Sequence, residues 1–250
     1  MIYADNAATT KVNEVAFEAM KPFLLNNYGN PSSIYSFAKK ARKAVENARK
    51  MIAMSIGAVP EEIYFTSGGT ESDNWALKGT AFANQNEGRH IVVSMIEHQA
   101  ILQACKTLES HGYAVTYAPV NKEGFVESEV LKKSLREDTI LVSVMMANNE
   151  IGTIQKIQEF ASILKPRGIV FHTDAVQAVG HIPIDVNSMG FDLLSASGHK
   201  FNGPKGVGFL YIKTGTPIDA FIDGGGQEMR KRAGTENVAG IVGMAYALHN

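Results

Sequence analysis

A lysine in a loop of small polar residues is the part of this sequence best suited to chemistry. Lys200 closes a run that begins at Ser197 and includes His199. Its amine can form a Schiff base with an aldehyde when desolvation or nearby cations lower its pKa. Upstream, Asp174 ends an apolar segment, and an acid beside a pyridinium nitrogen keeps that ring protonated and able to withdraw electrons. Lys200 and Asp174 together indicate an enzyme that uses pyridoxal phosphate (PLP), with small polar neighbours such as Ser197 and His199 as donors to its phosphate.

A glycine-rich turn provides a second candidate element. Residues 66–73 read Thr-Ser-Gly-Gly-Thr-Glu-Ser-Asp and lie between an apolar strand and a helix. A glycine such as Gly69 lets the backbone approach an anion, and a helix N-terminus supplies free amides and a partial positive charge. Thr70 and Asp73 also have the spacing of a capping box, so a tight turn with a good N-cap is the alternative. Because the Lys200 loop is present as well, we interpret the turn as a phosphate site.

Two further polar residues follow apolar strands. His98 begins a helix after one of them, so its imidazole can stack on a cofactor ring and exchange protons with it. The alternative is a helix N-terminal histidine that is satisfied by backbone. Asn149 ends another apolar strand and can hydrogen-bond a ring hydroxyl, or belong to a plain turn.

Other patterns carry less chemistry. The run from Gly198 to Gly206 is not a P-loop, because Pro204 stands where that motif needs lysine. The 7 histidines show no ligand spacing, so we expect no metal site. Cys105 shares a helix face with apolar residues and is expected to be a packing thiol, not a nucleophile.

Composition limits the class of protein. The chain has 250 residues, 45% of them hydrophobic and 20% charged, which is ordinary globular composition. A net charge of -1 gives no reason to expect a nucleic-acid or acidic-membrane partner. The sequence has no run of about 20 apolar residues and begins with no signal-peptide pattern. With a single cysteine, these features predict a soluble cytoplasmic protein.

Strand-like and helix-like segments alternate, which predicts an α/β fold with a mainly parallel sheet flanked by helices. Apolar residues at helical spacing predict a helix over about 35–57. Strands are predicted over 63–66, 90–94, 114–118, 140–146, 168–173, 193–196 and 207–212. Further helices are predicted near 71–85, 98–110, 127–136 and 156–165. A last helix begins near Thr235 and reaches the end of the sequence without a terminator, which is weak evidence of truncation.

These motifs, in this order, resemble the class V aminotransferase family of PLP enzymes, and within it the NifS/IscS-like cysteine desulfurases. The resemblance runs along the whole chain. It rests on residues 3–10, 28–33, 66–74, 97–98, 148–152, 172–177, 197–200 and 232–235. It implies PLP fold type I, the aspartate aminotransferase-like fold, with PLP as the cofactor.

The resemblance also implies a role for each matching residue. Lys200 would bond to PLP and later move the substrate α-proton, and His98 would stack on the ring. Asp174 would pair with the pyridine nitrogen, with Asn149 and Gln177 beside the ring. The phosphate would be held by residues of the two polar loops, namely Gly69, Thr70, Ser197 and His199. Thr235 would complete the phosphate site of a partner subunit, so a homodimer is implied.

The family reaction takes sulfur from L-cysteine, leaves L-alanine and forms a protein persulfide for iron–sulfur clusters or tRNA thiolation. A selenocysteine lyase, a cysteine sulfinate desulfinase or an aminotransferase of the same class is one alternative, and a non-catalytic PLP-binding dimer is another. Family members continue with a region that supplies the persulfide-forming cysteine and an arginine for the substrate carboxylate, whereas this sequence ends before it.

The expected domain organisation follows from that resemblance. Residues 1–14 would belong to an incomplete small domain whose C-terminal part is absent, and residues 15–250 would form the large PLP-binding domain. We therefore expect Asp5–Thr10 to be poorly anchored, PLP to be retained weakly, and desulfuration by this chain to be impaired or absent, because only a thiolate can accept the sulfur.

Overall fold

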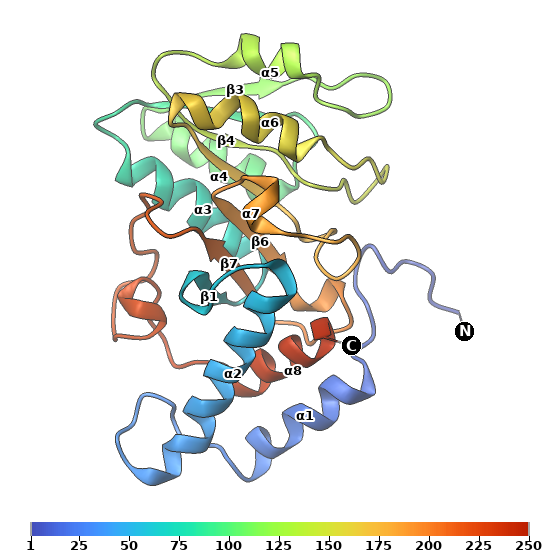
Figure 1. The fold of residues 1–250 in the computed structure, drawn as a ribbon, viewed down its shortest axis with the longest axis vertical. Coiled ribbons are helices and arrows are strands. Elements are labelled where there is room, and N and C mark those ends of the chain that lie inside the picture. The colour runs from blue at the N-terminus through green and yellow to red at the C-terminus, as the bar shows by residue number, and fades with distance from the viewer. Residues whose placement is uncertain (1, 250) are drawn as a thin grey trace.

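The structure, a computed structural model, describes residues 2–249, and a seven-stranded sheet runs through its centre (Figure 1). The strands lie in the order β1-β7-β6-β5-β4-β2-β3. Only β7 is antiparallel to its neighbours, whereas the other pairs are parallel. Their bounds are β1 (Ile63–Thr66), β2 (His90–Ser94), β3 (Ala114–Ala118), β4 (Thr139–Ser143), β5 (Val170–Asp174), β6 (Leu193–Ser197) and β7 (Gly208–Ile212).

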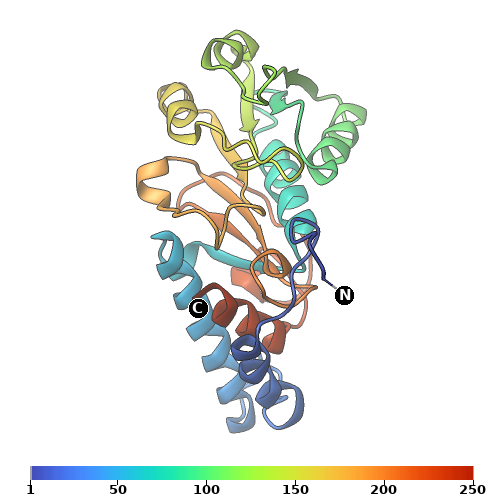
Figure 2. The ribbon, with the colours of Figure 1, turned by 90° about the vertical axis from the view of Figure 1, so that its right-hand side faces the viewer.

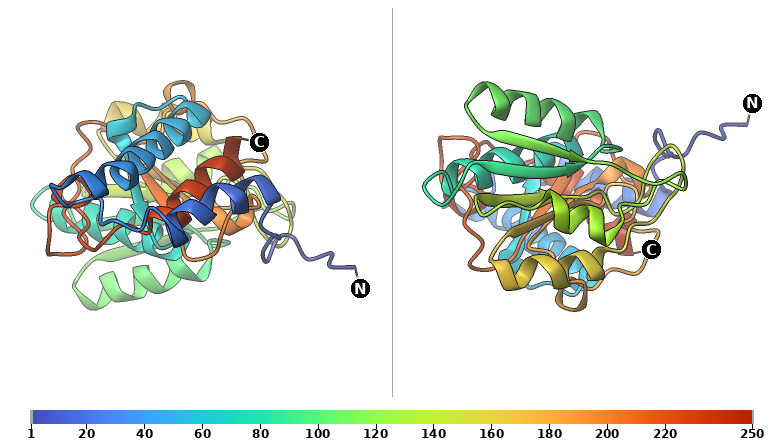
Figure 3. Two further views of the ribbon diagram at one scale, coloured as in Figure 1. Left: turned by 90° about the horizontal axis from the view of Figure 1, so that it is seen from below. Right: turned by 90° about the horizontal axis from the view of Figure 1, so that it is seen from above.

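Helices cover both faces of this sheet (Figures 2 and 3). The α-helices are α1 (Glu14–Leu25), α2 (Lys39–Ile56), α3 (Gly69–Ala83), α4 (Gln99–Ser110), α5 (Ser128–Ser134), α6 (Ile157–Leu164), α7 (Val186–Met189) and α8 (Val238–His249). Five short 3-10 turns are η1 (Ser36–Ala38), η2 (Pro60–Glu62), η3 (Lys165–Arg167), η4 (Gly198–Lys200) and η5 (Glu228–Arg230). None of the helices in the described part of the chain is long and apolar enough to span a membrane.

The alternation of side chains along each strand divides the core into two clusters. On β2, Ile91 and Val93 pack in the cluster under α3 and α4, whereas Val92 packs in the cluster on the other face. That second cluster contains residues of α2, α6 and α8, and of the shorter α5 and α7. The sheet is therefore buried on both faces, as expected for parallel strands joined by helices.

The predicted elements are confirmed in type, with differences at their ends. The helix predicted over 35–57 begins at Lys39, because 36–38 form the turn η1. The strand predicted over 140–146 pairs regularly only to Ser143, although the backbone of Met146 still donates to Asp174 O at 2.8 Å. The strand predicted from residue 168 begins at Val170, because Gly168 has a left-handed φ of 68° and ends η3.

Candidate cofactor site

One cavity of about 570 Å³ gathers the predicted chemistry-bearing residues at the carboxyl edge of the sheet. Asp174 and Ser197 are the last residues of β5 and β6. The carboxyl ends of parallel strands meet at one edge of a sheet, where α/β proteins form their sites. The same cavity is lined by Gly69, Thr70, His98, Asn149, Gln177, His199 and Lys200. Thr235 is the predicted site residue that lies elsewhere: it lines a separate cavity with Ser67 and Arg232.

Lys200 is held at this cavity by the first residues of the chain. Its Nζ donates to the carbonyl oxygen of Ala7 and, at 3.0 Å, to that of Ala8. Gln177 Nε2 donates to the same Ala7 oxygen at 2.9 Å. Partial burial lowers the pKa of Lys200, and the negative charges of Asp174 and Asp5 oppose this shift. A lowered pKa increases the fraction of neutral amine, which is the nucleophilic form.

The start of the chain is anchored more firmly than expected. The prediction that Asp5–Thr10 would be poorly anchored is wrong at Thr9 and Thr10. Thr10 is buried; its hydroxyl donates to His199 O at 2.8 Å and accepts from Asn202 N at 2.7 Å. Thr9 Oγ1 lies 3.0 Å from His199 Nδ1. Residues 5–8 are exposed, so hydrogen bonds to the Lys200 loop, and not apolar packing, fix this segment.

The N-terminus of α3 forms one wall of the cavity. Gly68 is the N-cap, with a φ of 149° that only glycine adopts readily, and no side chain among the described residues caps the helix. The predicted capping box is therefore wrong: Glu71, not Asp73, bonds back to Ser67 N at 2.9 Å. A Cβ on Gly69 would lie 2.6 Å from Val176 Cγ2. The first amides of α3 are thus left open to an anion.

Asp174 supplies the acid of the site. Its Oδ1 accepts a hydrogen bond from Val176 N at 2.9 Å, and its side chain lies against the cavity, next to Lys200 and His98. Burial raises the pKa of Asp174, while this backbone N–H and the charges of His98 and Lys200 lower it. The ionised form of Asp174 is therefore favoured most strongly when a cation occupies the cavity.

The alternatives left open by the sequence are settled in part by local geometry. His98 Nδ1 accepts from Ala100 N at 3.1 Å, so His98 caps α4, and its ring also lines the cavity. The turn after β4 is made by Asn148, whose Oδ1 accepts from Glu150 N and Ile151 N. Asn149 is left to line the cavity.

Cys105 and the metal-binding side chains lie outside this chemistry. Cys105 is fully buried in the cluster under α3 and α4, and burial raises the pKa of its thiol to about 12. The interpretation of Cys105 as a packing thiol is confirmed. Within residues 2–249, no three His, Cys, Asp or Glu side chains are grouped to hold a metal ion.

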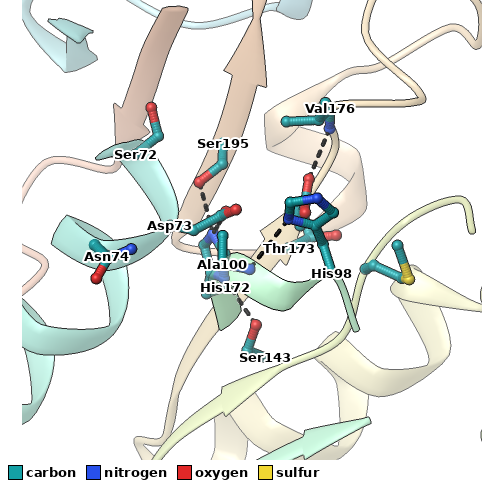
Figure 4. Close-up of polar contacts among 12 residues, drawn as sticks. Ser72, Asp73, Asn74, His98, Ala100, Ser143, His172, Thr173, Val176 and Ser195 are labelled. Atoms are coloured by element: carbon teal, nitrogen blue, oxygen red, sulfur yellow. Dashed lines mark hydrogen bonds and ion pairs between the residues drawn. The ribbon is translucent and has the colours of Figure 1, made fainter. Parts of the chain in front are cut away.

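Sequence reasoning missed a group of buried titratable residues near the cavity, of which Asp73 and His172 are labelled in Figure 4. Asp73 is 1% exposed, and His172 is fully buried on β5. Glu97 precedes His98 and is also buried; burial raises its pKa to about 8. One signal was present in the sequence: Asp73 lies on the same helical stripe as Ala76, Leu77 and Thr80, where a solvated charge is not expected.

The residues present fit PLP. The cavity volume lies in the range of small-molecule sites. A lysine amine, a buried acid and a glycine-opened helix N-terminus face the same space, as an aldehyde, a pyridine nitrogen and a phosphate require. The two additional loop donors, Ser197 and His199, lie on the same cavity wall as Lys200.

Comparison with known proteins gives consistent results. The family model described as Aminotransferase class-V matches residues 2–249. The cysteine desulfurase IscS of Dictyoglomus turgidum is 59% identical over 247 residues, covering 99% of this chain and 63% of that protein. The cysteine desulfurase IscS of Methanosarcina thermophila is 57% identical, covering 98% and 61%. The chain thus spans less than two thirds of the length of these curated relatives.

Solved structures agree in fold. One described as a NifS-like protein has a TM-score of 0.97 and 45% identity, covering 99% of this chain and 68% of that chain. Another, described as SspA in complex with cysteine, has a TM-score of 0.96 and 40% identity, covering 99% and 72%. The expected PLP fold type I, with a mainly parallel sheet flanked by helices, is therefore confirmed.

Proposed function

Because this chain belongs to the class V aminotransferase family, whose members are PLP enzymes, we propose that it forms the PLP-binding part of a cysteine desulfurase. The reaction would take sulfur from L-cysteine and leave L-alanine. The observation that carries the proposal is the meeting of Lys200, Asp174 and the N-terminus of α3 around one cavity. The two IscS relatives and the cysteine complex of SspA support this substrate.

Each residue of the cavity then has a defined task. PLP, when bound, supplies an aldehyde that accepts amines and a ring that withdraws electrons from the substrate α-carbon. Lys200 Nζ would bind the aldehyde carbon and would later hold and return the α-proton, and its lowered pKa increases the fraction of neutral amine that these roles need. Asp174 and His98 line the cavity; Asp174 would keep the ring nitrogen protonated, and His98 would cover the ring face.

The remaining polar residues orient the cofactor. Asn149 and Gln177 line the cavity and would lie beside the ring, with Gln177 near its phenolic oxygen. The phosphate would be held by the first amides of α3, including those of Gly69 and Thr70, and by the side chains of Thr70, Ser197 and His199. Donors that are already in place before the anion arrives would favour its binding.

Sulfur transfer requires an acceptor thiolate. In that step the thiolate attacks the sulfur of the substrate cysteine, and the bond between this sulfur and the β-carbon breaks. The electron pair of that bond stays with the β-carbon, which takes up a proton to give alanine, while the acceptor thiol becomes a persulfide. Cys105 does not serve as the acceptor, because it is fully buried and its pKa is raised to about 12. We therefore assign the acceptor role to a thiol other than that of Cys105, either in a further region of the protein or in a sulfur-acceptor protein for iron–sulfur cluster assembly or tRNA thiolation.

Reduction with borohydride after addition of PLP tests the site directly. We expect a yellow complex whose reduced adduct maps to Lys200, and we expect Lys200→Ala to lose it. Lys205→Ala is the matched control, because Lys205 is exposed and does not line the cavity. A wild-type adduct on another lysine, or one that persists in Lys200→Ala, would show that Lys200 is not the attachment point.

A second assay separates an enzyme from a binding module. The PLP-loaded chain is given L-cysteine and an external thiol such as dithiothreitol, and alanine is measured. Alanine above the level of Lys200→Ala supports desulfuration. A trapped adduct without alanine would instead favour a non-catalytic PLP-binding module.

We also infer a homodimer in which Thr235 completes the partner's phosphate site. The separate cavity that contains Thr235 supports this, because Thr235 does not line the cavity of its own Lys200. Residues 1–14 would belong to a small domain and 15–250 to the large domain. A reducing cytoplasm suits the single, buried cysteine. Light scattering of the purified chain tests the dimer.

A further inference from the structure

A second buried acid, Asp73, lines the same cavity as Asp174 and interacts with it. It stands in the second turn of α3, is 1% exposed and lines the same cavity as Lys200. Its Oδ1 has no hydrogen-bond partner within residues 2–249. In Figure 4 its side chain reaches from α3 toward the sheet, beside Ser195 and His172. An isolated carboxylate is costly in such a place unless a cation or several donors compensate it.

His172 does not supply that cation. Its Nδ1 hydrogen-bonds with Ser143 Oγ at 2.9 Å and its Nε2 with Ser195 Oγ at 3.0 Å. Burial lowers the pKa of His172 to about 3, so its imidazole is neutral near pH 7. The distance from His172 Nε2 to Asp73 Oδ1 is 3.7 Å, longer than a hydrogen bond. Asp73 and His172 therefore do not form an ion pair.

The charged groups around Asp73 are mostly acids. Asp174 on β5 and Glu97 after β2 face it, and burial followed by the charge of Asp174 raises the pKa of Asp73 well above its ordinary value. The favourable charge effects of Lys200 and His98 act on Asp174 instead. Two adjacent carboxyl groups in a dry site share one proton. Because Asp174 also accepts a backbone N–H, the proton stays on Asp73.

We propose that Asp73 is a positioning residue: it remains a neutral carboxylic acid, donates a hydrogen bond to Asp174, and holds Asp174 as the anion that faces the ring nitrogen. The last part rests on the proposed function, since it takes PLP as the group in the cavity. Asp73 would not touch the cofactor. It would keep Asp174, which does, ionised and oriented toward the ring nitrogen.

The first test needs no cofactor. Infrared spectra of the whole chain, made with isotope-labelled aspartate, report whether an aspartic acid is protonated at neutral pH. We expect a label-sensitive carboxylic-acid band in the wild type and in the control Asn74→Ala, which changes the next residue of α3. The band should disappear in Asp73→Asn. An absent wild-type band, or one that persists in Asp73→Asn, overturns the proposal.

The second test measures PLP binding. Asparagine keeps the shape of a neutral acid and can still donate to Asp174, so Asp73→Asn should bind PLP within about threefold of the wild type. Asp73→Ala should bind about tenfold or more weakly, with a less protonated ring nitrogen in nitrogen-labelled PLP. Equal weakening in both variants, or none in Asp73→Ala, contradicts the positioning role. If the wild type itself binds no PLP, the proposed function fails, and the infrared band still decides the state of Asp73.

Discussion

At the scale of single residues, the site is defined by acids removed from water. Asp73, Glu97 and Asp174 are each less than 6% exposed, and Lys200, His98 and His199 are basic side chains that share the cavity with Asp73 and Asp174. Burial raises the pKa of all three acids. Adding a cationic ring to such a site lowers the cost of ionising Asp174, so binding of the cofactor and the ionisation of these acids are coupled.

Replacing Glu97 tests whether burial keeps this acid protonated, through the pH dependence of stability. Burial raises the pKa of Glu97 from its ordinary value to about 8, so the folded chain holds this proton longer than the unfolded chain does. Stability is then full below the unfolded pKa and is lost as pH rises through the folded pKa, at up to about 1.4 kcal/mol per pH unit. Glutamine imitates the neutral acid, so Glu97→Gln should remove this loss.

Urea unfolding at several values from about pH 5 to about pH 8 provides the measurement. We expect the free energy of unfolding of Glu97→Gln to gain at least about 1 kcal/mol on the wild type across that range. Exposed Glu87 gives the matched control, Glu87→Gln. Parallel pH curves for wild type and Glu97→Gln would show that Glu97 is ionised throughout.

The residues of the site divide into those the sequence can reveal and those it cannot. Lys200, Asp174 and His98 follow or end apolar strands, and their types match known cofactor chemistry, so their meeting in one cavity was predictable. Asp73 lies within α3 and His172 within β5. Their neighbours in the sequence do not show which polar groups the fold places against them. Their contacts depend on the packing of α3 on β5 and β6.

At the scale of elements, one turn is held in an unfavourable backbone conformation. Glu228, Met229 and Arg230 have φ values of 43°, 55° and 65°, all left-handed, and each such residue costs on the order of 1 kcal/mol. The buried carboxylate of Glu228 compensates: it accepts two hydrogen bonds from Arg49 on α2 at 2.9 Å and one from Phe65 N on β1 at 2.8 Å.

Glu228→Gln should therefore lower the free energy of unfolding by about 3–5 kcal/mol, because it removes the buried partner of the Arg49 guanidinium and leaves it, among the described residues, only the exposed carboxylate of Glu46 as an acidic partner, at 3.5 Å. Met229→Gly changes the next residue of the turn and removes a left-handed side chain, so it should be neutral or stabilising by up to about 1 kcal/mol. Denaturant unfolding measures both. If Glu228→Gln costs no more than Met229→Gly, the ion pair does not hold the turn.

The ends of elements were the least predictable part of the fold, for reasons visible in particular residues. α3 begins at Gly69 and not at residue 71, because Gly68 takes a φ that the sequence does not specify. β4 ends at Ser143 although the apolar run continues to Ala147. An apolar run indicates that the residues are buried, but not whether they belong to a strand. After β4 the buried residues continue in an irregular conformation.

At the scale of the whole molecule, segments far apart in the chain must meet. Strand types were predictable from local patterns, but the antiparallel β7 between β1 and β6 was not, since it depends on long-range pairing. Gly208 on β7 shows how close this pairing is: a Cβ there would lie 2.4 Å from Ala196 O and 2.7 Å from Gly68 Cα. The N-terminal α1 likewise packs against α8.

The contact of α1 with α8 gives a prediction at this scale. A Cβ on Gly243 of α8 would lie 2.5 Å from Met20 Sδ on α1. Gly243→Leu should overfill this crossing and lower the free energy of unfolding by about 1–3 kcal/mol, measured by urea unfolding. Adding Met20→Ala should recover part of the loss, since it removes the side chain in the way. Strictly additive losses would show that the two helices do not cross at these residues.

The packing of α1 on α8 also bears on the order in which the protein is made. Ribosomes add about 5–20 residues per second, so about 10–50 seconds separate the first residues from the last in a chain of 250 residues. Throughout that interval α1 has been made, but its partner α8 has not. Within this chain, α1 is therefore among the last elements to complete its packing, although it is made before the sheet and before α8.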